Sequence, residues 1–332
     1  MSALGTNTMT LTDIAKGLDP NGSVAQVIEM LSTTNEMLDD MPFYEGNLPT
    51  GTRTTIRTGL PDVYWRLINQ GVLPSKGSKA QVDEQTGMLE AWSEVDTELL
   101  KLNGNSAAVR MSEARAFIEA MNQEMAYTMV YGNSSTDPEE INGFAVRYSD
   151  LTATNGQNIV DFQGSGAGGQ MSIWLVAWGQ ETVHGIVPKG SGSGLTHDDY
   201  GEVTVEVTAG VAGSRMRAMQ DRFQWKTGLV VKDWRYIVRG CNIDVSDLDG
   251  MSPADLVEGL ENMVELLPNS LGRPVFYTNR TFRKYLRRQV REAVGNGGGL
   301  TFENFAGKRV MMFGDIPFRR LDTLLNTEDE VS

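Results

Sequence analysis

Glu90, Glu94, Asp96 and Glu98 are the side chains whose type and spacing come nearest to catalytic chemistry. Paired carboxylates hydrolyse glycosidic bonds when an apolar pocket raises the pKa of one of them. Within Leu89–Leu99, however, apolar and acidic residues alternate, which predicts a strand whose carboxylates lie side by side on one exposed face. A structural role is therefore favoured, and an acidic, β-rich carbohydrate-active enzyme is kept as the alternative.

The segment Gly164–Gly169, GSGAGG, matches the G-x-G-x-x-G pattern of dinucleotide-binding loops. That chemistry needs a helix directly after the loop, because the helix N-terminus holds the pyrophosphate. Here the next segment, Ile173–Trp178, is a continuous apolar run of strand length. The pattern favours a flexible loop, and no Walker A motif occurs elsewhere in the chain. We therefore predict no cofactor.

Nucleophilic and metal chemistry have few candidate residues in this sequence. Cys241 is the only cysteine, which excludes an internal disulfide, and it follows a strand-like segment typical of a small buried residue. His184 and His197 do not have the spacing of a zinc site. No G-x-S-x-G motif is present. We predict neither a catalytic nor a metal-binding residue.

The composition indicates a globular protein of 332 residues with a formal net charge of −14. This negative charge argues against a surface that binds nucleic acid tightly, but it is compatible with a shell that encloses nucleic acid without binding it tightly. No apolar run is long enough to span a membrane, and the N-terminus lacks the apolar core of a signal peptide.

Residues 51–99 form the most unusual segment, an extended ribbon for which a structural role is favoured over a catalytic one. Strands are predicted at Thr52–Thr58, Val63–Ile68 and Leu89–Leu99. The first two predicted strands carry arginines, and the third carries the carboxylates. The ribbon has too little apolar surface to form a core of its own. We therefore expect it to contact another copy of the chain. The expected assembly contacts are Arg53, Arg57, Arg66, Glu90, Glu94, Asp96 and Glu98.

The rest of the chain divides into blocks of different character. Residues 1–45 read as an arm with one amphipathic helix over Ser23–Met41, and a long helix is predicted over Ser112–Tyr131. A strand-rich block follows, which includes Trp234–Arg239. The last third, with helices from Pro253 and Thr281 and a strand at Pro274–Thr278, is expected to hold a core of its own, and residues 327–330 to form a solvated tail.

The order of these blocks, together with four segments of the sequence, resembles that of a known protein family. The segments are INGF (Ile141–Phe144), FQWKTGLVVKDWRYIVRGCNID (Phe223–Asp244), RPVFYTNRTFRKYLRRQ (Arg273–Gln289) and FGDIPFRRLDTLLNTE (Phe313–Glu328). The chain resembles the major capsid proteins of tailed double-stranded DNA bacteriophages, which have the fold named after phage Hong Kong 97. The resemblance covers essentially the whole chain.

The resemblance implies an α+β capsid fold with four parts. These are an N-terminal arm (1–45), an extended β loop (46–104), a peripheral domain with a spine helix (105–246) and an α/β axial domain (247–332). Because the strand-rich block precedes the axial-like third, we expect a rearranged segment order, with Ile173–Trp178 and Trp234–Arg239 beside the spine helix.

The resemblance also implies that the chain is a structural protein and not an enzyme. Copies would form hexamers and pentamers that close an icosahedral head around double-stranded DNA, with extended loops lying over the neighbouring copy. A scaffold, a portal and a cement protein are the further partners implied, and there is no membrane partner. The protein would be made in the bacterial host cytoplasm and reside in the virion capsid. A nanocompartment shell subunit of the same fold is the second alternative.

Overall fold

The computed structural model describes residues 35–102, 106–164, 166, 168–191, 194–206, 213–248, 253–268, 271–293, 300–305 and 308–332. Most of the predicted N-terminal arm lies outside these residues, although Met37–Asp40 forms the short helix α2 at its end. The described chain divides into two compact units. Unit 1 contains Met88–Ala126 and Gly194–Lys226, and unit 2 contains Thr34–Gly87, Tyr127–Ser193 and Thr227–Ser332.

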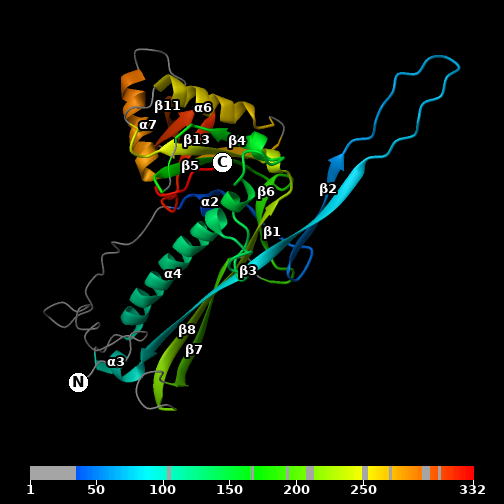
Figure 1. The fold of residues 1–332 in the computed structure, drawn as a ribbon. Helices are drawn as coiled ribbons and strands as arrows, with labels where there is room; N and C mark the ends of the chain where they lie inside the picture. The colour runs from blue at the N-terminus through cyan, green and yellow to red at the C-terminus, as the bar shows by residue number, and fades with distance from the viewer. Residues whose placement is uncertain are drawn as a thin grey trace. The chain divides into compact units, whose positions relative to one another are not determined.

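Unit 1 is built on a sheet of long antiparallel strands (Figure 1). Strand β7 (Leu195–Glu206) pairs with β8 (Arg215–Val231), which in turn lies beside β3 (Ser78–Asp96). Two helices follow β3 in the chain, α3 (Thr97–Leu102) and α4 (Ser106–Tyr131). Val95, Leu100 and Val109 form a small buried cluster that joins strand and helices. The long helix is confirmed, and it begins at Ser106 instead of Ser112.

Unit 2 contains a mixed sheet with β5 (Gln170–Trp178) at its centre, and every residue of this strand is buried. A strand that is buried along its whole length and apolar from Ile173 to Trp178 is typical of a strand covered on both faces. Its neighbours are β9 (Ile237–Asp244), β10 (Arg273–Thr278) and β6 (Val183–Val187). Three shorter strands extend the sheet, namely β1 (Phe43–Glu45) on β6, β4 (Ile159–Asp161) on β9 and β13 (Ile316–Arg320) on β10.

Helices and a hairpin complete unit 2 (Figure 1). Helix α6 (Pro253–Glu265) packs on β9 and β4, and α7 (Arg280–Ala293) follows β10 directly. Strands β11 (Leu300–Phe305) and β12 (Lys308–Phe313) form an antiparallel hairpin that continues into β13. Two single turns, α5 (Phe144–Arg147) and η1 (Gly156–Asn158), connect the end of α4 to the sheet.

The sheet of unit 2 corrects the expected division of the last third. Strand β10 pairs with β5 from Arg273↔Trp178 to Tyr277↔Trp174, and β5 pairs on its other edge with β9. The expectation that residues 247–332 hold a separate core is therefore wrong, because these strands share one sheet. The expected strand Trp234–Arg239 is also shorter. Trp234–Tyr236 forms the 3₁₀ turn η2, in which the Asp233 side chain accepts from the backbone N–H of Arg235.

The extended ribbon is a two-stranded hairpin with a long connection. Strand β2 (Gly51–Gly59) pairs antiparallel with the first part of β3, from Gly51↔Gln85 to Gly59↔Ser78. Residues 60–77 contain no strand, so the predicted strand at Val63–Ile68 is wrong. Its residue types favour β structure, but the described chain offers it no strand to pair with.

Phe162 occupies a niche that two glycines create in unit 2. A Cβ atom built on Gly259 of α6 would lie 2.3 Å from the Phe162 ring, and one built on Gly240 of β9 would lie 2.8 Å from it. Both distances are far below van der Waals contact, so the missing side chains let the helix and the strand close on the ring. Each glycine is therefore a packing requirement of this core.

We predict that Gly259→Ala lowers the free energy of unfolding of the subunit by about 1–3 kcal/mol, because the added methyl group overpacks the Phe162 niche. In an ordinary helix the same change stabilises by about 0.5–1 kcal/mol, so the sign of the effect is diagnostic. Denaturant unfolding of the variant measures it. Glu258→Ala at the exposed neighbouring position is the matched control and should be nearly neutral. A more stable Gly259→Ala variant would contradict the packing described.

Candidate assembly surface

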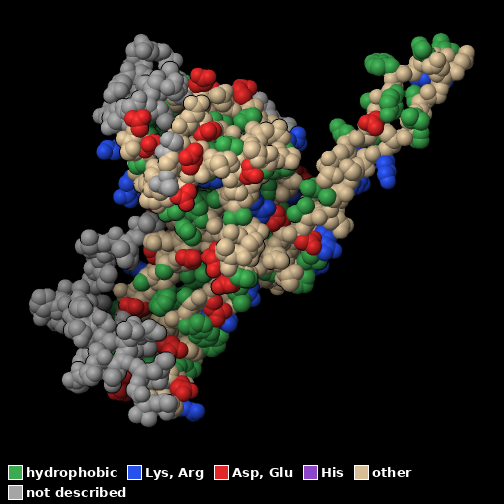
Figure 2. All heavy atoms as spheres, viewed as in Figure 1, with side chains coloured by type: hydrophobic (Ala, Val, Ile, Leu, Met, Phe, Trp, Pro, Cys, Tyr) green, Lys and Arg blue, Asp and Glu red, His purple; other side chains and the backbone are tan. Residues whose placement is uncertain are grey.

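The tip of the β2–β3 hairpin, residues 60–77, exposes an unusual set of large apolar side chains. They are Leu60, Val63, Tyr64, Trp65, Leu67, Ile68, Val72 and Leu73. The Trp65 side chain is fully exposed, at 104% of its reference area. Figure 2 shows hydrophobic side chains gathered over the outer end of this hairpin. Contiguous exposed apolar surface of this kind marks a contact site for another molecule.

The base of the hairpin is firmly held, in contrast to its tip. The Arg147 guanidinium donates to both carboxylate oxygens of the buried Glu84 at 2.6 and 2.7 Å, which ties β3 to α5. Gly51 has a φ of +157°, and a Cβ atom there would lie 2.0 Å from the carbonyl oxygen of Glu84. The two limbs therefore meet so closely that only glycine fits at this point.

The three arginines of the ribbon differ in their surroundings. Arg53 forms a two-point ion pair with Asp83 on the facing limb, at 2.6 and 2.7 Å, and this hydrogen bonding lowers the pKa of Asp83. Arg57 and Arg66 are both exposed, and within the described chain no ion pair forms at either. The structure thus gives Arg53 an internal partner and leaves Arg57 and Arg66 available.

The four carboxylates of the predicted acidic face belong to unit 1 and contact local partners. Glu90 accepts from the Trp92 indole N–H and the Gln224 amide, and Glu94 accepts from the Gln220 amide. Asp96 accepts from the backbone N–H of Glu98, and Glu98 pairs with Lys101 at 2.7 Å. The last two contacts start helix α3, so Leu89–Leu99 is a strand only as far as Asp96.

A cleft of about 660 Å³ lies in unit 2 between β2 and the turn around η2. Thr54–Leu60, Glu181 and Lys232–Arg235 line it. Two ion pairs, Lys232–Glu181 at 3.2 Å and Arg235–Asp233 at 2.7 Å, neutralise most of its charge. No histidine or cysteine is among these lining residues, and the carboxylates of Glu181 and Asp233 and the ammonium of Lys232 are held in those ion pairs.

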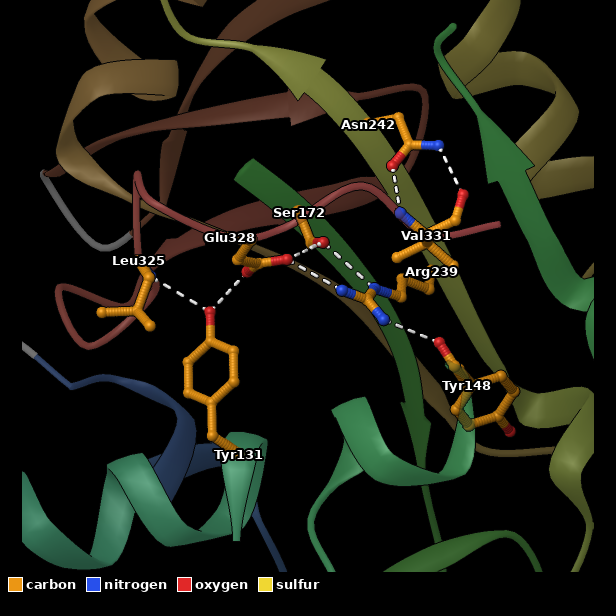
Figure 3. Close-up of polar contacts among 8 residues, drawn as sticks. All are labelled: Tyr131, Tyr148, Ser172, Arg239, Asn242, Leu325, Glu328 and Val331. Carbon is orange, nitrogen blue, oxygen red and sulfur yellow. Dashed lines mark hydrogen bonds and ion pairs between the residues drawn. The ribbon is translucent and has the colours of Figure 1, made fainter. Parts of the chain in front are cut away.

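A buried ionic network fixes the end of the chain to the core of unit 2 (Figure 3). The Arg239 guanidinium contacts Glu328 at 2.8 Å and the Tyr148 carbonyl oxygen at 2.7 Å, and lies 5.2 Å from the Trp174 ring centroid. The Tyr131 hydroxyl, in the last residue of α4, donates to the other oxygen of Glu328 at 2.5 Å. Burial raises the pKa of Tyr131 well above its usual range, so it is a neutral donor.

The C-terminal segment is anchored at further points, so the expected solvated tail is only partly confirmed: Thr327, Asp329 and Glu330 are exposed, whereas Glu328 is buried. The Asn242 side chain accepts from the backbone N–H of Val331 at 2.8 Å and donates to its carbonyl oxygen at 2.9 Å. Glu328 and Gln170 exchange backbone hydrogen bonds, as in a short antiparallel bridge. No local sequence pattern signals this anchoring, because a run of acidic residues is usually solvated.

The residues first considered for catalysis have structural surroundings. Strand β5 follows Gly164–Gly169, and the backbone N–H groups of Gly166 and Gly168 donate to Glu330 and Asp329 of the same chain. Cys241 is buried, and burial raises the pKa of its thiol to about 12, so it is not a nucleophile. His197 stacks on Phe223 with ring centroids 4.8 Å apart and contacts Asp221.

Two negative findings apply to the described residues only. No group of three or more potential ligands gathers where it could hold a metal ion. No described helix is both long and apolar enough to cross a membrane.

Comparison with known proteins identifies the class to which this fold belongs. The family model "Major capsid protein GP7" matches residues 19–332. A chain in the near-atomic structure of bacteriophage Epsilon15 is 32% identical, with a TM-score of 0.80 over 100% of this chain and 99% of that chain. Comparison with curated proteins gives no match.

More distant solved structures show only weak likeness. A chain of the bacteriophage JBD30 capsid is 10% identical, with a TM-score of 0.45 over 89% of this chain and 92% of that one. A chain of the native GTA particle capsid is also 10% identical, with a TM-score of 0.47 over 71% and 99%.

The chain belongs to the major capsid protein GP7 family. It has a mixed α/β capsid fold and is the major structural protein of a phage head, where it assembles with itself into the capsid lattice. The family is structural and not enzymatic, so the carbohydrate-active enzyme is excluded, and the virion location excludes the nanocompartment alternative.

We predict that Glu328→Gln lowers the free energy of unfolding of the subunit by about 3–5 kcal/mol, because it leaves the buried Arg239 guanidinium without its counter-ion. Urea unfolding of the unassembled subunit measures the change. Glu330→Gln, at an exposed position two residues later, is the matched control and should cost less than about 0.5 kcal/mol. Equal effects of the two substitutions would contradict the network in Figure 3.

The buried His184 makes subunit stability depend on pH. Burial lowers its pKa from 6.5 to about 4, so below pH 6.5 the unfolded chain binds a proton that the folded chain does not. We expect this group to cost up to roughly 3 kcal/mol of unfolding free energy as the pH falls from 6.5 to 4. His184→Gln should remove this part of the pH dependence, whereas His197→Gln should not. Parallel pH profiles for His184→Gln and the unchanged chain would overturn the prediction.

Proposed function

We propose that the hairpin tip of each copy is buried on a neighbouring copy, and that this contact joins the subunits of the capsid lattice. The observation that supports this proposal is the set of eight exposed large apolar side chains between Leu60 and Leu73. Burying one such side chain stabilises by about 1.5–3 kcal/mol, so even partial cover of the tip outweighs exposed ion pairs at about 0–1 kcal/mol each.

The firm base of the hairpin supports this role. Because Glu84 and Arg147 fix β3 to unit 2, ordering the tip on a neighbour costs less conformational entropy than ordering a free loop. Arg57 and Arg66 are proposed as charged contacts at the rim of this interface. For Arg53, Glu90, Glu94, Asp96 and Glu98 we propose a lesser contribution, since each has a partner within its own chain.

We propose hexamers and pentamers as the capsomers and an icosahedral head that encloses double-stranded DNA. The net charge of −14 supports enclosure without sequence-specific binding. The likeness to tailed-phage capsid proteins supports a scaffold, a portal and a cement protein as further partners, and synthesis in the host cytoplasm.

The likeness to tailed-phage capsid proteins also suggests a role for each part of the subunit. Residues 1–45 act as the arm. Of the expected extended loop, 46–104, we propose that residues 46–87 act as that loop, because the chain from Met88 belongs to unit 1. The expected border between a peripheral part (105–246) and an axial part (247–332) does not fit the β9-β5-β10 sheet, which contains strands from both. We propose instead that this sheet with α6 and α7 is axial, and that the strands and helix of unit 1 are peripheral.

Limited trypsin digestion tests the proposed role of the tip. We predict cleavage after Arg57, Arg66, Lys76 or Lys79 in the unassembled subunit and protection of the same bonds in assembled particles, because proteases cut segments that open locally. Mass spectrometry of the fragments locates the cuts. An exposed bond outside the hairpin that is cut equally in both states is the internal control. Tip cleavage at the same rate in particles and subunits would refute the proposal.

A further inference from the structure

Helix α6 of unit 2 carries a row of carboxylates on its outer side, which we call the acidic stripe. The apolar side of α6 is buried, and the helix packs on β9 and β4. The stripe consists of Glu258, Glu261 and Glu265, and all three side chains are exposed. Because they are three and four residues apart, they lie on one face of the helix. Within the described chain no ion pair forms at any of them.

Helix α7 carries a row of cations, which we call the basic stripe. Its apolar side is buried as well. Arg280, Lys284 and Arg287 are exposed, and Arg283 is half-buried. These cations occupy positions i, i+3, i+4 and i+7, and the carboxylates of α6 occupy i, i+3 and i+7. Seven residues of helix rise about 10.5 Å, so the two stripes have the same length.

The basic stripe is crowded with like charge. Burial lowers the pKa of Arg283, and the positive charges of Arg287 and Arg320 lower it as well. The opposing carboxylates near Arg283 are Glu36 and Asp322. Both are already engaged, because Glu36 accepts from the backbone N–H of Arg320 at 2.8 Å and Asp322 pairs with the Arg320 guanidinium. The stripe therefore has more cations than these two carboxylates neutralise.

Each stripe is unfavourable for the helix that carries it. Like charges three or four residues apart repel each other, and this repulsion destabilises a helix. An opposite stripe on a second molecule converts the repulsion into attraction. In Figure 2 acidic side chains gather over the part of unit 2 that holds α6, and basic side chains lie at the edge that holds α7. One subunit thus presents both signs, each on its own helix.

We propose that the acidic stripe of α6 in one copy of this chain pairs with the basic stripe of α7 in the next copy. The two stripes match in sign, spacing and length, and no ion pair joins the two helices within the described part of one chain. The contact is heterologous, since the stripes are different surfaces of the subunit, so its repetition closes a ring. This inference rests on the proposed hexamers and pentamers and names a contact within them.

The pairing acts by setting the orientation of neighbouring copies. A single exposed ion pair contributes little to stability, but a copy turned the wrong way places like charges together, which is strongly unfavourable. Each copy offers one acidic and one basic stripe, so every copy in a ring receives the same two neighbours. The contact is thus independent of the hairpin tip.

Zero-length crosslinking of assembled particles tests the proposal with the unchanged chain. A carbodiimide joins a carboxylate to an amine that touches it, and Lys284 is the only lysine of α7. We expect an amide bond between Lys284 and a glutamate of the acidic stripe, located by mass spectrometry. Because the contact repeats around a ring, a denaturing gel should show a ladder of covalent oligomers that ends at the hexamer.

The matched control is Lys284→Arg, which keeps the positive charge and removes the amine. Particles of this variant should form normally and lose the ladder. Particles of the unchanged chain that lack this crosslink, or carry it only within monomers or dimers, would overturn the proposal and leave the proposed function intact. Failure of the unchanged chain to form particles would instead refute the proposed function.

Charge exchange gives an independent readout of the same contact. Lys284→Glu with Arg287→Glu should reduce particle yield about tenfold or more, since repulsion acts at every copy of the interface. Adding Glu258→Lys and Glu261→Lys to the same chain should restore most of the yield, which a folding defect could not explain. Loss of yield without restoration would count against the pairing.

An equal charge change elsewhere controls for net charge. Arg115→Glu with Lys189→Glu alters two exposed cations on other elements and should leave the yield within about twofold of the unchanged chain. If Lys284→Glu with Arg287→Glu instead gave normal yields of particles that retain less DNA, the pairing would be wrong. The basic stripe would then be a contact for the phosphate groups of the packaged DNA.

Discussion

The constraint on which the structure depends is an apolar surface that the described residues of one chain leave uncovered. The hairpin tip places Trp65, Ile68 and their neighbours in water, where each costs free energy that burial would recover. A soluble monomer has no use for such a surface, whereas a subunit of a lattice does. Under the proposed function this surface is covered when copies associate, and the family assignment agrees with self-assembly.

The body of the subunit is organised so that the exposed tip does not destabilise it. Unit 2 surrounds the fully buried strand β5 with paired strands, and its interior ion pairs are satisfied. Arg239 and Glu328 join three distant parts of the chain, the end of α4, the central sheet and the C-terminal segment (Figure 3). A buried ion pair of this kind adds little net stability, but it penalises any arrangement that leaves one charge unpaired.

Sequence patterns predicted the elements better than their arrangement. The apolar run Ile173–Trp178, the long helix up to Tyr131 and the helices from Pro253 and Thr281 follow from local periodicity and capping, and all are present. The pairing of β10 with β5 depends on contacts between residues about 100 positions apart, which no local pattern encodes. The burial of Glu328 depends on Arg239, which lies 89 residues earlier.

The sequence and the structure both point to the ribbon as the candidate assembly surface, but for different reasons. The ribbon was singled out by its charges, and the structure shows Arg53 already paired and the carboxylates locally bonded. The apolar residues of Val63–Ile68 were interpreted as a strand, because β-branched and aromatic residues favour one. Only the structure shows that the same residues are exposed.

A cryo-EM density map of the assembled particle tests the central claim most directly. The account predicts that residues 60–77 have ordered density against a neighbouring subunit, with Trp65 covered by that subunit. A map in which the tip projects into solvent, or in which neighbouring subunits contact each other only through other surfaces, would contradict it.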